Sequence, residues 1–137
     1  MRQPHEVLVF VRRGEEFLML HRSERQGAYW HSVAGGVELG ESAAEAAKRE
    51  LHEETGLAAE PEPTGRSFTY VPEAWESHAG IGAVRVDCFL VEAPTDWEPE
   101  LDWEHDEFRW CRPKEAGELL FWPEPRELLR QIASAPR

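Results

Sequence analysis

Short apolar runs, separated by glycines and charged residues, predict alternating strands and helices along this chain. Residues 5–13 (HEVLVFVRR) are apolar at both alternating sets of positions, which is typical of a strand covered on both faces. Gly14 allows a turn, and residues 15–22 (EEFLMLHR) follow as the partner strand of a hairpin. Further strands are expected at residues 29–33, 66–71, 82–92 and 107–112.

The clearest helix is predicted over residues 42–55. Ser42 and Glu45 form a Ser-x-x-Glu capping box at its start, and strong helix formers fill its interior. Gly56 follows at the position where a left-handed backbone ends many helices.

Two closing helices are expected over residues 113–120 and 123–133, the second with one apolar stripe formed by Leu128, Leu129 and Ile132. Strands in both halves of the chain, with helices between them, predict a mixed sheet sandwiched by helices. We therefore expect a single α/β/α domain over residues 1–137.

The charge balance narrows the classes of partner. A formal net charge of −12 argues against binding to DNA, RNA or an anionic membrane, because such binding needs a basic surface. A small polyanionic substrate remains compatible with this charge if a divalent cation assists its binding. Residues 1–6 show no signal-peptide pattern, so a cytoplasmic location is expected. Cys88 and Cys111 lack metal-knuckle spacing and are interpreted as buried, reduced thiols.

Three glutamates gather on one side of the predicted central helix. Glu50, Glu53 and Glu54 fall within about a third of its circumference. Like charges at this spacing destabilise a helix by about 0.2–0.5 kcal/mol per pair, and a hard divalent cation would reverse that effect. The adjoining face is expected to pack on the sheet, with Lys48 and His52 facing outward; it consists of Ala44, Ala47 and Leu51.

A solvated charged face is the other interpretation of this helix, since Arg49 can pair with Glu45 or Glu53. The preceding segment favours a ligand site. Residues 35–41 (GGVELGE) carry three glycines, which let backbone groups approach a ligand closely, although a tight turn would also use them.

Gly35, Glu41 and residues 49–57 (RELHEETGL) match the Nudix box at every fixed position over residues 35–57. The chain thus resembles the Nudix hydrolases, a MutT-like family. Residues 29–38 (YWHSVAGGVE) resemble the approach to the box in dATP and dihydroneopterin-triphosphate pyrophosphohydrolases. Residues 104–110 resemble the acidic loop and strand downstream of the box.

This resemblance implies an α/β/α sandwich and an enzyme that cleaves a nucleoside diphosphate linked to another moiety X. It implies that Glu50, Glu53 and Glu54 bind Mg²⁺ or Mn²⁺, joined by a backbone carbonyl near Gly35. Arg49 would orient a catalytic carboxylate, most simply Glu53, and Glu41 would support the loop. The general base is expected among Glu50, Glu104 and Glu107, although Glu104 can also be surface charge.

Candidate substrate contacts come from cations and aromatic residues near the box. Ordinary surface or core positions are the alternative for each of them, and Trp110 is expected in the core. Phosphates would meet Gly36 and the arginines, and a base would stack on the aromatic rings. These residues are Arg22, Arg25, Arg66, Arg85, Tyr29, Trp30, Trp75 and Trp103.

The approach to the box favours a nucleoside triphosphate-like substrate. Pro72 instead resembles a marker of ADP-ribose pyrophosphatases, and a nucleotide sugar is a further alternative. His78 is a candidate acid or base, or simply a loop residue. A non-catalytic nucleotide sensor and an acidic interaction domain are the rival classes. The expected partner is a small nucleotide, and the expected state is a monomer or homodimer.

Overall fold

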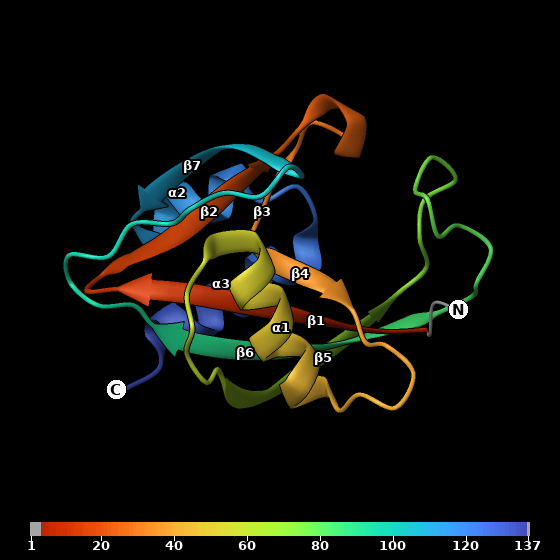
Figure 1. Cartoon of the computed structure of the whole chain (residues 1–137), viewed down its shortest axis with the longest axis horizontal. Helices are drawn as coiled ribbons and strands as arrows, with labels where there is room; N and C mark the ends of the chain where they lie inside the picture. The colour runs from red at the N-terminus through yellow and green to blue at the C-terminus, as the bar shows by residue number, and fades with distance from the viewer. Residues whose placement is uncertain (1–3, 137) are drawn as a thin grey trace.

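The strand at the centre of the fold is β1 (His5–Arg13), in a computed structural model that describes residues 4–136. It pairs in parallel with β6 (Val84–Glu92) along almost its whole length. On its other edge it pairs antiparallel with β4 (Val33–Gly36) near its start and with β2 (Glu16–Arg22) near its end. Figure 1 shows these strands crossing the middle of the molecule.

The remaining strands extend both edges of this mixed sheet. The strand order is β3-β2-β1-β6-β5, where β3 is Trp30–His31 and β5 is Glu62–Tyr70. β7 (His105–Cys111) pairs antiparallel with β2. Because β1 pairs on both edges and is covered on both faces, residues 7–11 are at most 1% exposed, as its continuous apolar pattern predicts.

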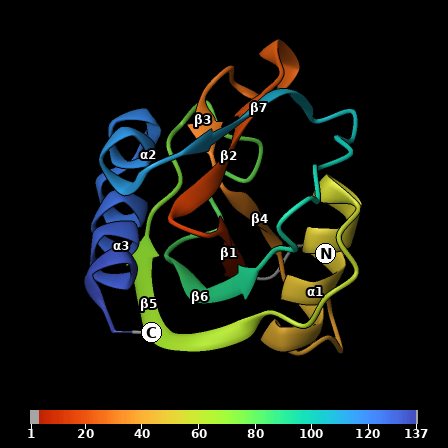
Figure 2. The same cartoon turned by 90° about the vertical axis from the view of Figure 1, so that its left-hand side faces the viewer.

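Two hydrophobic clusters cover the two faces of the sheet. α1 (Ala43–Thr55) packs on the face that carries Val7 and Val9 of β1. α2 (Pro113–Leu119) and α3 (Pro123–Ser134) pack on the opposite face, and Figure 2 shows the helices on the two sides of the sheet. The predicted α/β/α sandwich is confirmed. The predicted apolar stripe of α3 is buried, and it consists of Leu128, Leu129 and Ile132.

Local signals set the ends of α1. The Ser42 hydroxyl accepts from the Glu45 amide at 3.1 Å, and the Glu45 carboxylate accepts from the Ser42 amide at 2.8 Å. Gly56 ends the helix with φ 81°, where its amide donates to the His52 carbonyl. The prediction that Ala44 packs on the sheet is wrong: Ala44 is exposed, because the buried stripe of α1 is centred on Ala47 and the glutamates rather than on Ala44.

The predicted strand over residues 29–33 is in fact two strands. The break is at Ser32, whose buried hydroxyl donates to the Val9 carbonyl at 2.7 Å. β3 therefore pairs with β2 and β4 pairs with β1, while Tyr29 lies outside both strands. The chain must change partner strand here, and the apolar pattern of the segment does not reveal that change.

Other predictions differ from the structure at element ends only. β5 begins earlier than expected, since Glu62 and Pro63 already pair with β6.

Cys88 and Cys111 are buried free thiols as predicted, and burial raises the pKa of Cys88 to about 12. Within residues 4–136, no helix combines the length and apolar character needed to cross a bilayer. Residues 1–3, part of the segment without a signal-peptide pattern, lie outside the described residues.

Candidate functional site

The glutamates of α1 face β4 and one wall of a large cleft. Glu50 is 9% exposed and Glu54 is 1% exposed, so both carboxylates lie between the helix and the sheet. The Glu53 side chain is 54% exposed and stands at the rim. Glu50 and Glu53 line the cleft, and Glu54 lies behind them. Three residues adjacent on the helix thus occupy three different depths.

Gly35 of β4 lies directly against the Glu50 carboxylate. A methyl group added at Gly35 would lie 2.2 Å from Glu50 Cδ and 2.4 Å from Glu50 Oε1. Any side chain at this position would therefore displace the carboxylate. Gly35 lies in an ordinary strand, so its backbone angles do not require a glycine. The position requires a glycine because the backbone packs closely against the Glu50 side chain.

Gly35→Ala is expected to lower the free energy of unfolding by only about 1 kcal/mol, the low end of the usual cost of extra volume, because it displaces the end of the flexible Glu50 side chain. It should also abolish stabilisation by added Mn²⁺, because the displaced Glu50 carboxylate no longer faces its neighbours. Thermal unfolding with and without Mn²⁺ measures both effects. Gly117→Ala is the control, since its added methyl would meet its nearest atom at an ordinary 3.7 Å. Equal behaviour of the two variants would refute the steric argument.

Glu54 is the least compensated carboxylate of the site. Its Oε1 accepts from the Ala34 amide at a long 3.4 Å, and its Oε2 has no hydrogen-bond partner among the described residues. Burial and the neighbouring Glu50 raise the pKa of Glu54 well above its usual value. A buried carboxylate destabilises a protein unless a cation or hydrogen-bond donors compensate its charge. Glu54 and Glu50 together therefore fit the ligand set of a hard divalent cation.

Arg49 ties the glycine-rich loop to α1. Its Nε and Nη2 donate to the two Glu41 oxygens at 2.8 and 2.9 Å, and Nη2 also donates to the Gly36 carbonyl at 2.9 Å. Nη1 donates to Glu50 at 2.7 Å and lies 3.4 Å from Glu53. These bonds lower the pKa of Glu41 and raise that of Arg49. Arg49 is thus closer to Glu50 than to Glu53, the partner expected from the resemblance.

A divalent cation would find part of its ligand set in place. Among the described residues, no three His, Cys, Asp or Glu side chains already converge as a ready metal cage. The reason is visible at Glu53, which turns toward Arg49 and solvent. Glu50 and Glu54 supply two adjacent carboxylates, and Glu53 is near enough on the helix to complete the set after a side-chain rotation.

A buried histidine lies beside Glu54 without a hydrogen bond to it among the described residues. His105 of β7 places Nε2 3.7 Å from Glu54 Oε1, and its Nδ1 lies 2.8 Å from Asp102 Oδ1. The His105 side chain has no exposed area, and burial lowers its pKa. The sequence did not single out His105, because the strand β7 that carries it reaches Glu54 only through pairing with β2.

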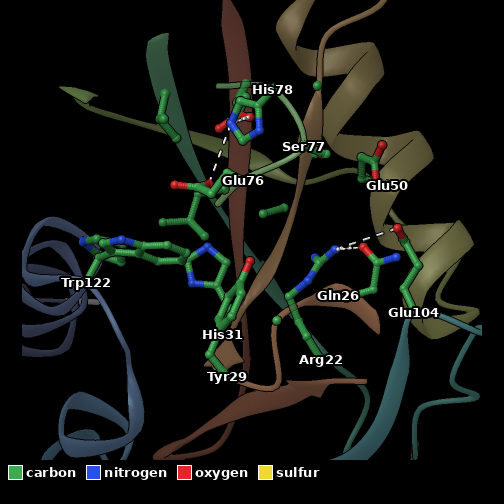
Figure 3. A pocket seen from close by; sticks show the side chains of 18 of the residues that line it. Arg22, Gln26, Tyr29, His31, Glu50, Glu76, Ser77, His78, Glu104 and Trp122 are labelled. Carbon is green, nitrogen blue, oxygen red and sulfur yellow. Dashed lines mark hydrogen bonds and ion pairs between the residues drawn. The ribbon is translucent and has the colours of Figure 1, made fainter. Parts of the chain in front are cut away.

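The cleft has a volume of about 960 Å³ and joins two chemically different ends. Figure 3 shows Glu50, Glu104, Arg22 and Gln26 at one end, which we call the glutamate end. Arg22 Nη2 lies 3.7 Å from Glu104 and donates to Gln26 at 2.8 Å. Burial is the main cause of a raised pKa at Glu104.

Aromatic side chains form the other end of the cleft, on the left of Figure 3. The indoles of Trp75 and Trp122 are parallel within 10°, with ring centroids 6.2 Å apart. Tyr29 packs edge-on against both, with centroids 6.1 and 4.8 Å away. His31 meets Trp122 at 5.5 Å, and burial lowers the pKa of His31 to about 3. We call this the aromatic end.

The structure separates the predicted substrate residues into two groups. Those that line the cleft are Arg22, Arg25, Tyr29, Gly36, Trp75 and Trp103. Trp30 does not line it, because it points to the other side of β3 from His31 and packs against Arg109, 5.0 Å from its ring. Arg66 instead donates to Gln131, and Arg85 pairs with Asp87.

Two further predictions concern residues outside the cleft. Glu107 does not line it and lies 3.5 Å from Arg109, so it is poorly placed as a base. Trp110 is partly buried against the core, with Arg13 over its ring at 4.0 Å, as expected.

The cleft also contains residues that the sequence did not single out, namely His31, Glu76 and Trp122. Among these residues the sequence offered a signal for His31 alone, which is two positions from Tyr29 and can lie on the same side of a strand.

Comparison with known proteins agrees with this geometry. A model of the NUDIX domain matches residues 2–132. An octanoyltransferase of Myxococcus xanthus is 33% identical over 131 residues, which are 93% of this chain and 36% of that protein. The chain spans between 28% and 41% of the length of the first curated relatives it matches.

Solved structures share the fold over nearly the whole chain. An E. coli dihydroneopterin triphosphate pyrophosphohydrolase aligns with a TM-score of 0.85 at 23% identity, covering 96% of each chain. A Listeria monocytogenes protein assigned to the NUDIX hydrolases aligns with a TM-score of 0.80 at 29% identity, covering 96% of this chain and 92% of that one. The resemblance seen in residues 35–57 is confirmed, and the chain belongs to the NUDIX domain family.

Proposed function

We propose that this protein is a Mg²⁺- or Mn²⁺-dependent pyrophosphohydrolase that cleaves a phosphoanhydride bond in a nucleoside triphosphate-like substrate. The buried and poorly compensated Glu54 carboxylate beside Glu50 carries this proposal. A purely structural helix face would not keep two carboxylates together under the sheet edge. The cleft beside them is within the usual size range of small-molecule sites, about 300–1,000 Å³.

Glu50, Glu53 and Glu54 are the proposed metal ligands, with a backbone carbonyl near Gly35. A divalent ion held by these residues would supply positive charge against the phosphates and favour deprotonation of the attacking water. Arg49 holds the Glu50 carboxylate in place, and Glu41 fixes Arg49 in turn. Both residues are thus positioning groups for the acidic cluster.

Glu104 is the proposed general base. It lines the cleft, is partly buried, and its raised pKa suits a group that accepts a proton near neutral pH. Glu50 is less suited, because its carboxylate already accepts from Arg49. In the proposed step, a water oxygen forms a bond to phosphorus while the anhydride P–O bond breaks. The proton of that water passes to Glu104, and the leaving phosphate takes the bond electrons.

The phosphates are proposed to lie at the glutamate end, where Arg22 and Arg25 line the cleft. The rest of the substrate then extends toward the aromatic end, where Tyr29 and Trp75 offer ring faces for stacking. ADP-ribose and nucleotide sugars are the alternative substrates, and a nucleotide sensor is the alternative class. A cytoplasmic location and a monomeric or homodimeric state remain predictions from the sequence.

A hydrolysis screen tests the proposal. Nucleoside triphosphates, ADP-ribose, dinucleoside polyphosphates and nucleotide sugars are incubated with Mg²⁺, Mn²⁺ or EDTA, and pyrophosphate and phosphate are measured. We expect metal-dependent cleavage of at least one triphosphate, and a loss of about 10²-fold or more in Glu104→Gln. Full activity in EDTA would exclude the metal site, and tight nucleotide binding without cleavage would favour the sensor.

A further inference from the structure

The aromatic end of the cleft carries negative charge as well as ring faces. Glu76 lines the cleft, and its side chain is only 8% exposed. Its Oε1 accepts from the Glu73 amide at 2.8 Å, and its Oε2 lies 3.7 Å from His78 Nε2. An ionised carboxylate has about four acceptor positions, so Glu76 keeps acceptor capacity beyond these contacts.

Glu6 adds a second carboxylate to the same region. It accepts from the Tyr70 hydroxyl at 2.6 Å, and its other oxygen lies 3.4 Å from His78 Nε2. Tyr70 and His78 line the cleft together with Glu6. Glu6 and Glu76 thus place two carboxylates around His78.

Few of the described residues that line the cleft are cationic. Among the described residues that line the cleft, the only lysine or arginine side chains are Arg22 and Arg25. Arg22 lies beside Glu104 at the glutamate end, and Arg25 belongs to the same short turn as Gln26 (Figure 3). His31 is not a cation at neutral pH, since burial lowers its pKa to about 3. Arg22 also lies 5.7 Å from the centre of the Tyr29 ring, so it reaches the border of the aromatic end.

Two ring nitrogens lie buried in the wall of this end. Nδ1 of His31 and Nδ1 of His78 are both inaccessible to solvent and have no hydrogen-bond partner among the described residues. Both residues line the cleft. Because both atoms are closed to solvent, neither faces a ligand in the cleft, and the candidate acceptors at this end are the carboxylate oxygens of Glu76.

We propose that the aromatic end binds a planar nitrogen heterocycle through an edge with two adjacent hydrogen-bond donors, a ring N–H beside an exocyclic amine, as in guanine. Tyr29, Trp75 and Trp122 supply the ring faces, which accept any base. Glu76 supplies the acceptors that distinguish one base edge from another. This inference rests on the proposed function, which places the phosphates at the glutamate end.

Guanosine and inosine test the donor edge, because they differ by the exocyclic amine alone. Binding of each nucleoside is followed by quenching of tryptophan fluorescence, without metal and without hydrolysis. We expect guanosine to bind about 10-fold more tightly or better, as for a hydrogen bond to a charged acceptor. The ratio of kcat/KM for GTP over ITP should show the same preference. Equal binding of the two nucleosides would overturn the inference.

The variant Glu76→Gln tests whether Glu76 causes the preference for guanosine over inosine. Glutamine keeps a side-chain oxygen for the Glu73 amide, so the loop turn is retained, but it brings its own donor against the ligand edge. We expect the guanosine preference to fall to about threefold or less. Glu73→Gln is the matched control, an exposed neighbour that does not line the cleft and should keep the preference. An unchanged preference in Glu76→Gln would exclude Glu76 as the residue that recognises the donor edge of the base.

The same experiment separates the two proposals. If guanosine binds preferentially but no nucleotide is cleaved with Mg²⁺ or Mn²⁺, the proposed hydrolysis fails and the base preference stands. If triphosphates are cleaved at equal rates whatever their base, the hydrolysis stands and the inference about the aromatic end fails.

Discussion

Replacing Glu54 by glutamine is expected to lower the rate of metal-dependent hydrolysis by about 10³-fold or more, which corresponds to about 4 kcal/mol of activation free energy. Glu54 is fully buried beside Glu50, so it has no role in solubility or surface charge. A neutral amide keeps the shape of the side chain but cannot neutralise a divalent cation. The measurement is kcat at saturating Mn²⁺, on the best substrate from the hydrolysis screen.

Two further variants make this result specific. Glu53→Gln should also reduce turnover, because Glu53 completes the proposed ligand set. Glu60→Gln is the control: Glu60 follows the same helix, pairs with Lys48 at 2.8 Å and has a side chain that is 72% exposed. Its activity should stay near that of the parent protein. Near-normal turnover in both Glu53→Gln and Glu54→Gln would remove α1 from the mechanism.

Removing divalent metal is expected to lower the melting temperature by about 10 °C relative to saturating Mn²⁺. A ligand at about 100 times its Kd stabilises the native state by about 2.7 kcal/mol. One kcal/mol corresponds to roughly 3–5 °C for a domain of this length. Scanning calorimetry in EDTA and in Mn²⁺ measures the difference. Glu54→Gln should lose most of it, and an equal melting temperature in both buffers for the parent protein would contradict a metal site.

The pH dependence of the metal-free protein follows from the direction of the Glu54 shift. Its pKa is raised above the ordinary value of about 4.5, so its contribution to stability is complete below that pH and is lost as pH rises toward the raised value. The metal-free parent should therefore become less stable than metal-free Glu54→Gln as pH rises above 4.5.

Comparing the two proteins at neutral pH isolates Glu54 from the buried histidines. The pKa values of His31 and His105 are lowered from 6.5, so these groups reduce stability as pH falls below that value. His31 does so in both proteins, whereas His105, with Nε2 3.7 Å from Glu54 Oε1, also responds to the substitution. The comparison is therefore made above pH 6.5, where both histidines are neutral. A constant difference in melting temperature across the neutral range would show that Glu54 is already compensated within the fold.

The sequence by itself determined the elements that depend on local contacts. The capping box and Gly56 set the ends of α1, because those bonds join residues within one or two turns. The spacing of Glu50, Glu53 and Glu54 placed them on one side of that helix for the same reason. The continuous apolar pattern of β1 likewise required other elements to pack against both faces of the sheet.

Only the tertiary structure decided which of these residues form the cleft. The break at Ser32 depends on a hydrogen bond to Val9, and the position of His105 beside Glu54 depends on β7 pairing with β2. Trp122 meets Tyr29 because a bridge between Trp30 and Leu120 holds the segment between α2 and α3 beside β3. Such contacts join segments far apart in the chain, and their geometry follows from strand pairing and core packing. No local pattern of hydrophobic and polar residues encodes that geometry.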